Sequence, residues 1–297
     1  MMKTARNKET RKALIGLAFV SPWLIHLSVF KIYPVIISLY YSFTDFIGIN
    51  VAEWVGLRNY QAMFADPLFW LSIRNTLFYA AFTVVGILVF SIFLATVLSN
   101  DLKEISLWRS VVYFPSILPI FASSFIWMWV FQPHFGIING FLLKLGIEGP
   151  GWYADPEWAK PTLILLKVWG AGNVVLIFLA SINDISKELY EVASLDGAGW
   201  FRKFRHITLP SISPIILFNT IIITNQSLQV FTEAYIITDG GPSNSTLFYT
   251  LYLYQQAFMN SKMAQAMAMS WALLVFSLLL TMVLFKSTRG FVFYRGE

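Results

Sequence analysis

The stretch EVASLDGAGWFRKFRHITLP, Glu191–Pro210, is a compact polar segment inside a chain that is otherwise strongly apolar. Apolar residues recur at helical spacing before the dipeptide Asp196-Gly197, which favours a turn, and again after it. We therefore expect two short amphipathic helices, over residues 185–195 and 200–205, folded around that turn. The apolar runs on both sides are long enough to place the segment at a membrane surface.

The composition is that of a bilayer protein. Of 297 residues, 57% are hydrophobic and 12% are charged, which is about half the charged share of a soluble domain. The net charge of +5 comes from basic residues between apolar runs, so topology explains it better than a nucleic-acid-binding face. There is no cysteine, which excludes disulfides and thiolate metal sites, and His26, His134 and His206 show no metal-ligand spacing.

Six apolar runs are long enough to cross the hydrocarbon core, for which a helix needs roughly 20 residues. They are Ala13–Phe43, Ile73–Leu98, Ser110–Phe131, Pro161–Ile182, Leu209–Phe231 and Ala264–Phe285. The first contains Lys31 and Pro34, yet the part after Lys31 is too short to cross alone, so we interpret the run as one long helix and an uncleaved anchor.

Prolines interrupt two of these runs. Pro115 and Pro119 lie within the third, and Pro210 and Pro214 open the fifth. Proline removes a backbone donor and kinks a helix. Such kinks are common in transporters and equally common as static packing features, so they carry little weight in predicting function.

Basic residues orient the chain, because cytoplasmic loops carry an excess of Lys and Arg. With the N-terminus inside, 14 of the 21 Lys and Arg fall on the cytoplasmic side and five on the outer side. The prediction is an all-α integral membrane protein with six transmembrane helices and both termini cytoplasmic. Its parts are a basic tail at 1–12, a first transmembrane helix at 13–43, a five-helix core at 73–285 that carries the polar loop 185–210, and a C-terminal tail at 286–297.

Helical spacing also appears in the two outer loops. Leu57, Tyr60 and Phe64 share one helix face, and Ile137, Phe141 and Leu145 share another. These patterns predict short helices that lie on the membrane face.

The small residues of the polar segment have two interpretations. A solvent-exposed surface loop explains the charges of the segment. A helix that inserts into a cleft of a partner protein also explains why four small residues lie so close together, namely Ala193, Gly197, Ala198 and Gly199. The residues alone leave both open.

The segment resembles the EAA loop of ABC-importer permeases, in which Glu-Ala-Ala is followed three residues on by Gly-Ala and then by Ile-x-Leu-Pro. The matching residues are Glu191, Val192, Ala193, Asp196, Gly197, Ala198, Phe204, Ile207, Leu209, Pro210 and Pro214, with Val192 in place of the family's alanine. Further matches are WVGLRNYQAMFADPLFW (54–70), FGIIN (135–139) and FTEAYIITDGGPSNST (231–246). They indicate the sugar-importer branch of the maltose-permease type, from which Asp239 and Ala264 depart because glycine is usual at both positions.

The resemblance implies a type I importer fold and a set of partners: a second homologous permease, two cytoplasmic ATPase subunits and an extracytoplasmic sugar-binding protein. Glu191 would pair with a basic residue of the ATPase cleft, and Ala193 and Gly197 would let the coupling helix seat there. Asp196 and Ala198 complete the set of residues expected to couple the permease to the ATPase. This chain has no phosphate-binding loop, so ATP and Mg²⁺ are expected on the ATPase subunits, with no cofactor here. The setting would be the cytoplasmic membrane of a bacterium or archaeon.

In the resembled family the solute pocket lies between the spans that flank the EAA loop. The candidates here are Leu166, Lys167, Gly170 and Asn173 in the fourth run and Ile223, Gln226, Ser227 and Val230 in the fifth, with Trp169, Phe231 and Trp271 as aromatic platforms. Amides and hydroxyls suit sugar hydroxyls, and a glycine leaves room for a sugar ring. The competing explanation is hydrogen bonding between helices.

Lys167 is unusual because a charge in the middle of a span costs about 2.5–3.5 kcal/mol on insertion scales and should face a cavity or a partner. Two roles stay open from the sequence. Lys167 either attracts a carboxylated sugar such as a uronate oligomer, or pairs with an acid of the second permease.

Other classes fit less well. A proton- or sodium-driven transporter is disfavoured because the predicted spans lack Asp or Glu and no inverted repeat is evident. A membrane enzyme lacks a cluster of His, Cys or acidic residues in the spans. A permease for glycerol phosphate or another solute remains the main alternative to a sugar permease.

Overall fold

The computed structural model describes residues 2–100 and 104–288, apart from the side chains of residues 2–11, 13 and 288. The described part is mainly helical, and its only extended pairing is an isolated antiparallel bridge between Thr44 and Trp54. Lys103 and residues 289–297 of the predicted C-terminal tail lie outside the described residues. The chain divides into two compact units, residues 1–65 with 254–272 and residues 66–253 with 273–297.

The first unit begins with a long helical run formed by α1 (Met2–Leu27), a π-helical turn (Ser28–Ile32) and α2 (Tyr33–Tyr41). Pro34 lies in the first turn of α2. It has no N–H to donate and its ring crowds the carbonyl four residues earlier, so the wider π turn before it allows the helix to continue. Residues 14–41 form one candidate membrane span without an interruption.

The rest of the first unit is a loop and two short helical pieces. Helix α3 (Arg58–Ala65) is the short helix predicted from the spacing of apolar residues in the first outer loop. The Asn59 amide donates to the carbonyls of Ser42 and Thr44 at 2.8 and 2.7 Å, which ties α3 to the end of α2. The unit also takes in the π turn Gln255–Met259 and the first residues of α16 (Met263–Thr288).

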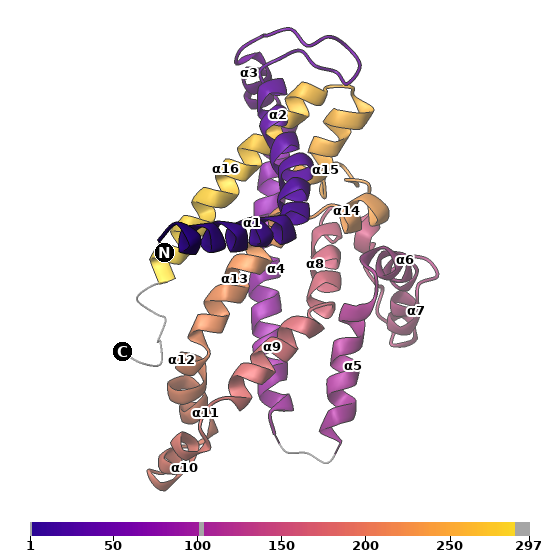
Figure 1. Cartoon of the computed structure of the whole chain (residues 1–297). Coiled ribbons are helices and arrows are strands. Elements are labelled where there is room, and N and C mark those ends of the chain that lie inside the picture. Colours follow the sequence, from indigo (N-terminus) through magenta and orange to yellow (C-terminus); the bar gives the residue numbers. More distant parts are fainter. Residues whose placement is uncertain (1, 101–103, 289–297) are drawn as a thin grey trace. The chain divides into compact units, whose positions relative to one another are not determined.

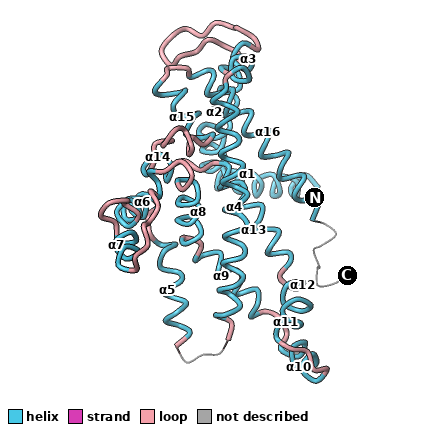
Figure 2. Tube along the Cα trace, turned by 180° about the vertical axis from the view of Figure 1, so that it is seen from behind, coloured by secondary structure: helices cyan, strands magenta, loops and turns pink. Residues whose placement is uncertain are grey.

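The second unit contains the remaining helices (Figures 1 and 2). They are α4 (Pro67–Leu98), α5 (Ile105–Ile117), α6 (Ile120–Val130), α7 (Ile137–Lys144), α8 (Ala159–Trp169), α9 (Gly172–Asn183), α10 (Lys187–Leu195), α11 (Trp200–Lys203), α12 (Leu209–Ser211), α13 (Ser213–Leu228), α14 (Thr232–Ile237), most of α15 (Tyr249–Tyr254) and the end of α16. Helix α7 lies where the apolar spacing of the second outer loop predicted a short helix.

Helix α4 is the central element of the second unit, and it packs against α8, α9 and α13. One cluster of buried side chains in this unit is aliphatic apart from one phenylalanine. Its buried members are Ile87, Ala95, Leu98, Ala171, Val174, Val175, Phe178, Leu179, Ile182, Ile185, Ile212 and Ile223. Small side chains such as Ala95 and Ser91 allow close approach of neighbouring helices, as is usual inside membrane bundles.

The third predicted span is broken, and the break is much sharper than a proline kink. Helices α5 and α6 meet at an angle of 100°. Leu118 and Pro119 both have extended backbone, with ψ of 131° and 132°. A residue before proline is disfavoured in the helical region, so the chain leaves the helix at Leu118 and restarts after Pro119. The prediction of one kinked helix over Ser110–Phe131 is therefore wrong.

The fourth predicted span is bent by 47° between α8 and α9, at Gly170 and Ala171. Directly after the bend, α9 approaches the backbone of α5. A β-carbon on Gly172 would clash with the Val112 carbonyl oxygen and lie 2.9 Å from the Tyr113 Cα. Glycine is therefore required at residue 172 because the two backbones touch.

The segment after α14 is held against the N-terminal half of α4. The Asn75 amide donates to the carbonyls of Asn244 and Leu247 at 2.9 and 3.2 Å, and the Thr76 hydroxyl accepts from the Tyr249 N–H at 2.8 Å. Asp239 lies in the same segment with a φ of 47°, in the left-handed region that favours glycine. This explains why the family pattern has glycine where this chain has Asp239.

Among the described residues, four helical stretches are long and apolar enough to cross a membrane, and the two bent pairs raise the number to six if each counts as one span. The four are Leu14–Tyr41, Pro67–Leu98, Ser213–Ile237 and Met263–Ser287. The fifth span thus extends beyond its predicted end at Phe231 and includes α14.

Replacing Gly172 tests the contact between α5 and α9. We expect Gly172→Ala to destabilise the purified protein by about 1–3 kcal/mol, because neither backbone can move aside without disturbing the helices. Thermal unfolding in detergent measures the effect. Gly140→Ala in α7 is the control, since a β-carbon there meets nothing within 4 Å. An unchanged melting temperature for Gly172→Ala would contradict the packing described above.

Candidate functional site

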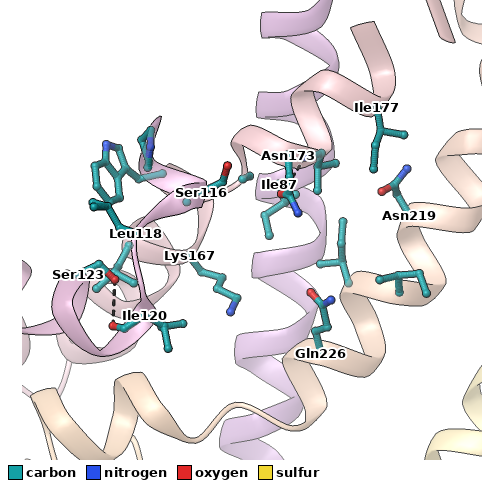
Figure 3. A pocket seen from close by; sticks show the side chains of 18 of the residues that line it. Ile87, Ser116, Leu118, Ile120, Ser123, Lys167, Asn173, Ile177, Asn219 and Gln226 are labelled. Carbon is teal, nitrogen blue, oxygen red and sulfur yellow. Dashed lines mark hydrogen bonds between the residues drawn. The ribbon is translucent and has the colours of Figure 1, made fainter. Parts of the chain in front are cut away.

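The second unit contains a cavity of ≈ 390 Å³ at the two helix breaks (Figure 3). The corner between α5 and α6 supplies one wall and the bend between α8 and α9 supplies another. Helices α4 and α13 complete the lining. Binding sites for small molecules have volumes of about 300–1,000 Å³, so this cavity is large enough for a small solute.

Six of the eight predicted pocket residues line the cavity. They are Leu166, Lys167, Gly170, Asn173, Ile223 and Gln226. The prediction placed the first four on one continuous helix, whereas the structure breaks that helix at Gly170. Residues on both sides of the bend still line the same cavity because the bend opens toward it.

Ser227 and Val230 do not line the cavity. Ser227 is completely buried, and its hydroxyl finds no hydrogen-bond partner within the described residues. Successive residues of an α-helix are rotated by about 100°, so Gln226 and Ser227 face different neighbours. Val230 lies beyond the end of α13 at Leu228, where the helical spacing no longer applies.

Of the three predicted aromatic platforms, only Trp169 lines the cavity. The Trp127 ring contacts the Trp169 ring edge-on, with ring centroids 5.1 Å apart. Phe231 stacks on Tyr235, and the Trp271 indole donates to the Ser38 hydroxyl within the first unit.

Three polar side chains that were not predicted for the site, those of Ser116, Ser123 and Asn219, also line the cavity. The two serines flank the corner at Pro119, so the proline pair that was given little weight marks one wall of the site. Ser116 and Ser123 donate to the carbonyls of Tyr113 and Ile120, which leaves their oxygen lone pairs as acceptors. Asn219 lies one helical turn before Ile223, a spacing that could have identified it.

The cavity lining offers hydrogen bonds of both kinds. Asn173 accepts from the Val174 N–H at 2.9 Å, so its NH₂ group remains a donor. Asn219 donates to the Ile215 carbonyl at 2.9 Å. The Gln226 side chain makes no hydrogen bond within the described part of the chain. Figure 3 shows Asn173, Asn219 and Gln226 along one side of the cavity, with apolar side chains between them.

Lys167 has a partner that the sequence analysis did not foresee. Its Nζ donates to Glu233 Oε1 at 3.0 Å, and the two side chains are 27% and 4% exposed. The acid therefore belongs to this chain and lies in α14. Because the fifth span extends to Ile237, the statement that the spans lack an acidic residue is also wrong.

No group of three or more His, Asp and Glu side chains that could hold a metal ion occurs among the described residues. The candidate site thus consists of the cavity and the polar segment 185–210.

The polar segment forms the two short helices predicted around Gly197, α10 and α11, and continues through a π-helical turn (Phe204–Thr208) into α12. Figures 1 and 2 show α10 and α11 at the end of the second unit where α4 ends and α5 begins. Glu191, Asp196 and Gly197 are exposed, whereas Ala193 and Ala198 are partly buried.

Gly197 terminates α10 in a Schellman motif. It has a φ of 72°, its own N–H bonds the Ser194 carbonyl at 3.1 Å, and the Ala198 N–H bonds the Ala193 carbonyl at 2.9 Å. A β-carbon there would meet nothing within 4 Å in this chain. Within the chain, glycine is therefore required for backbone conformation and not for space.

The segment is anchored to the helical core at its base. The Tyr190 hydroxyl bonds the Thr208 hydroxyl at 2.8 Å, which joins α10 to the turn before α12. Ile185 belongs to the buried core, and Tyr190 and Ile207 pack against it. A force on α10 is thus transmitted to α9 and α12, the two helices that enter and leave the segment.

Known proteins resemble this chain over nearly its whole length. Residues 106–290 match the family model described as binding-protein-dependent transport system inner membrane component. The probable ABC transporter permease protein YesP of Bacillus subtilis is 39% identical to this chain. The alignment covers 98% of this chain and 96% of the YesP sequence. The lactose transport system permease protein LacF of Rhizobium radiobacter is 34% identical, covering 82% of this chain and 83% of its own.

The fold is also known. A chain of a bacterial ABC transporter involved in the import of the acidic polysaccharide alginate superposes with a TM-score of 0.85 and 24% identity, covering 95% of this chain and 97% of that one. The family resemblance read from the EAA-like segment is thereby confirmed. This chain belongs to the family of binding-protein-dependent transport system inner membrane components, the permease subunits of ABC transporters.

Proposed function

We propose that this chain is the permease subunit of an importer that moves sugars, and in particular oligosaccharides, across the cytoplasmic membrane of a bacterium or archaeon. The observation that carries the proposal is the cavity at the two helix breaks, with amides, hydroxyls and one tryptophan in its lining. Such groups match the alternating hydroxyls and apolar faces of a sugar ring. The name of the lactose permease relative supports the same class of solute.

The proposed topology has six spans, with each bent pair counted as one. Both termini then lie on the cytoplasmic side, together with α10 and α11. The distribution of Lys and Arg in the sequence supports this orientation. The cytoplasmic ends are the basic tail 1–12 and the segment 286–297.

In this proposal two ATPase subunits bind ATP and Mg²⁺ and hydrolyse the nucleotide. Helix α10 is the part of the permease to which one of these subunits binds. Its exposed Glu191 and Asp196 suit a basic cleft. A second, homologous permease completes the pathway, and the complex receives its solute from an extracytoplasmic binding protein, as the family description indicates. Closure of the ATPase pair would then rock the spans through the anchored segment.

A sugar panel tests the proposed substrate class. The cognate binding protein is heated with lactose, maltotriose, arabinotriose, digalacturonate and glycerol 3-phosphate, and uptake of each is measured in vesicles that contain the complete transporter. We expect stabilisation and ATP-dependent uptake of at least one sugar. Stabilisation and uptake of glycerol 3-phosphate alone would overturn the sugar assignment.

Two substitutions of Gly197 separate backbone conformation from size. Asparagine adopts the left-handed conformation readily, whereas valine is strongly disfavoured there, at a cost of roughly 1–2 kcal/mol or more. We expect Gly197→Asn to keep co-purification with the ATPase subunits and Gly197→Val to reduce it several-fold, because only valine disrupts the end of α10. Equal loss in both variants would show instead that the ATPase surface leaves no room for any side chain.

A further inference from the structure

The pairing of Lys167 with Glu233 joins the cavity to a residue outside it. Among the described residues that line the cavity, Lys167 is the only charged one. Glu233 is not part of the lining and lies in the first turn of α14, almost fully buried. The two side chains therefore lie in different environments. The Lys167 ammonium group borders the cavity, and the Glu233 carboxylate is enclosed by protein.

A lysine by itself is a poorly ordered donor in such a place. Its four-carbon stem is flexible, so the ammonium group can take many positions. A buried carboxylate at 3.0 Å opposes this freedom, because the charge-assisted hydrogen bond restricts the side chain to one direction. The Lys167 ammonium has three N–H donors, so the bond to Glu233 leaves the others for a further acceptor.

The surroundings of Lys167 place these donors on the solute's side. Figure 3 shows Lys167 reaching from α8 into the space between the corner at Leu118–Ser123 and Gln226. The amides of Asn173, Asn219 and Gln226 can both donate and accept, whereas Lys167 only donates. A sugar offers many oxygen acceptors, so an oriented ammonium group complements the amides.

We propose that Glu233 is a positioning residue for the transported solute: it holds the Lys167 ammonium group in one orientation at the cavity, where Lys167 donates to an oxygen atom of the solute. Glu233 itself does not touch the solute. This inference rests on the proposed transport function and adds a residue that neither the family description nor the names of the relatives assign.

A purely mechanical role makes a different prediction. If the pair only fastens α14 to α8, its loss weakens folding and assembly but not the affinity for solute. If Glu233 positions Lys167, its loss raises the KM for solute in the complexes that do assemble. The two roles separate when KM and complex yield are measured on the same preparations.

The experiment uses the complete transporter with its binding protein in proteoliposomes. The initial rate of ATP-driven uptake is measured as a function of concentration for radiolabelled lactose, maltotriose, arabinotriose and digalacturonate. The variants are Lys167→Met, Glu233→Gln, the double variant Lys167→Met/Glu233→Gln, and Glu233→Asp. Lys160→Met is the matched control, because Lys160 is also on α8 but donates to the Asn75 amide oxygen at 3.0 Å and does not line the cavity.

For whichever of these sugars the unmodified transporter takes up, we expect KM to rise roughly tenfold in Lys167→Met and in Glu233→Gln, as the loss of a charge-assisted hydrogen bond implies. The double variant should be no worse than either single one, because both act through the same ammonium group. Glu233→Asp should recover part of the affinity. Lys160→Met should leave KM within about twofold.

Unchanged KM values in Lys167→Met and Glu233→Gln, with reduced complex yield, would overturn the inference and leave the sugar function intact. A double variant whose KM rises by the product of the two single effects would also overturn it. If the unmodified transporter takes up none of the four sugars, the proposed function fails, and the inference falls with it.

Discussion

The site depends on the requirement that every backbone polar group in a bilayer be satisfied by protein or by water in a cavity. An interrupted helix leaves N–H and C=O groups without intrahelical partners, so interruptions cannot face lipid. Two sharply bent interruptions among the described residues, at Leu118–Pro119 and at Gly170–Ala171, border the same cavity. The cavity and the breaks therefore belong together, because interrupted backbone is tolerated where it lines a cavity.

Helix α4 gives these breaks a rigid support. It is an uninterrupted helix of 32 residues and packs against α8, α9 and α13, so the bent pair α8–α9 follows a straight neighbour. The close approach of Gly172 to Val112 and Tyr113 then fixes α5 against α9. Because interiors are closely packed, a shift at one of these contacts is passed to the next instead of being absorbed locally.

The two parts of the candidate site share α9 and α13 as neighbours. Asn173 lies near the start of α9, at the cavity, and the other end of α9 leads to α10 through the buried Ile185. On the return path, the π turn and α12 lead to α13, which carries Asn219 and Gln226. The chain thus connects α10 through two helices to the side of the cavity that carries the three amides.

The sequence by itself determined the helical membrane class, the two short helices around Gly197 and the family, and it singled out six residues that line the cavity, because all of these depend on apolar run length, local spacing or a local motif. It did not determine the 100° corner, since proline shows where a helix is disturbed but not by how much. Nor did it reveal that Lys167 meets Glu233, 66 positions later in the chain. That contact depends on where α14, which packs against α6, lies relative to α8, and the sizes and directions of packed side chains decide it only when the whole second unit has folded.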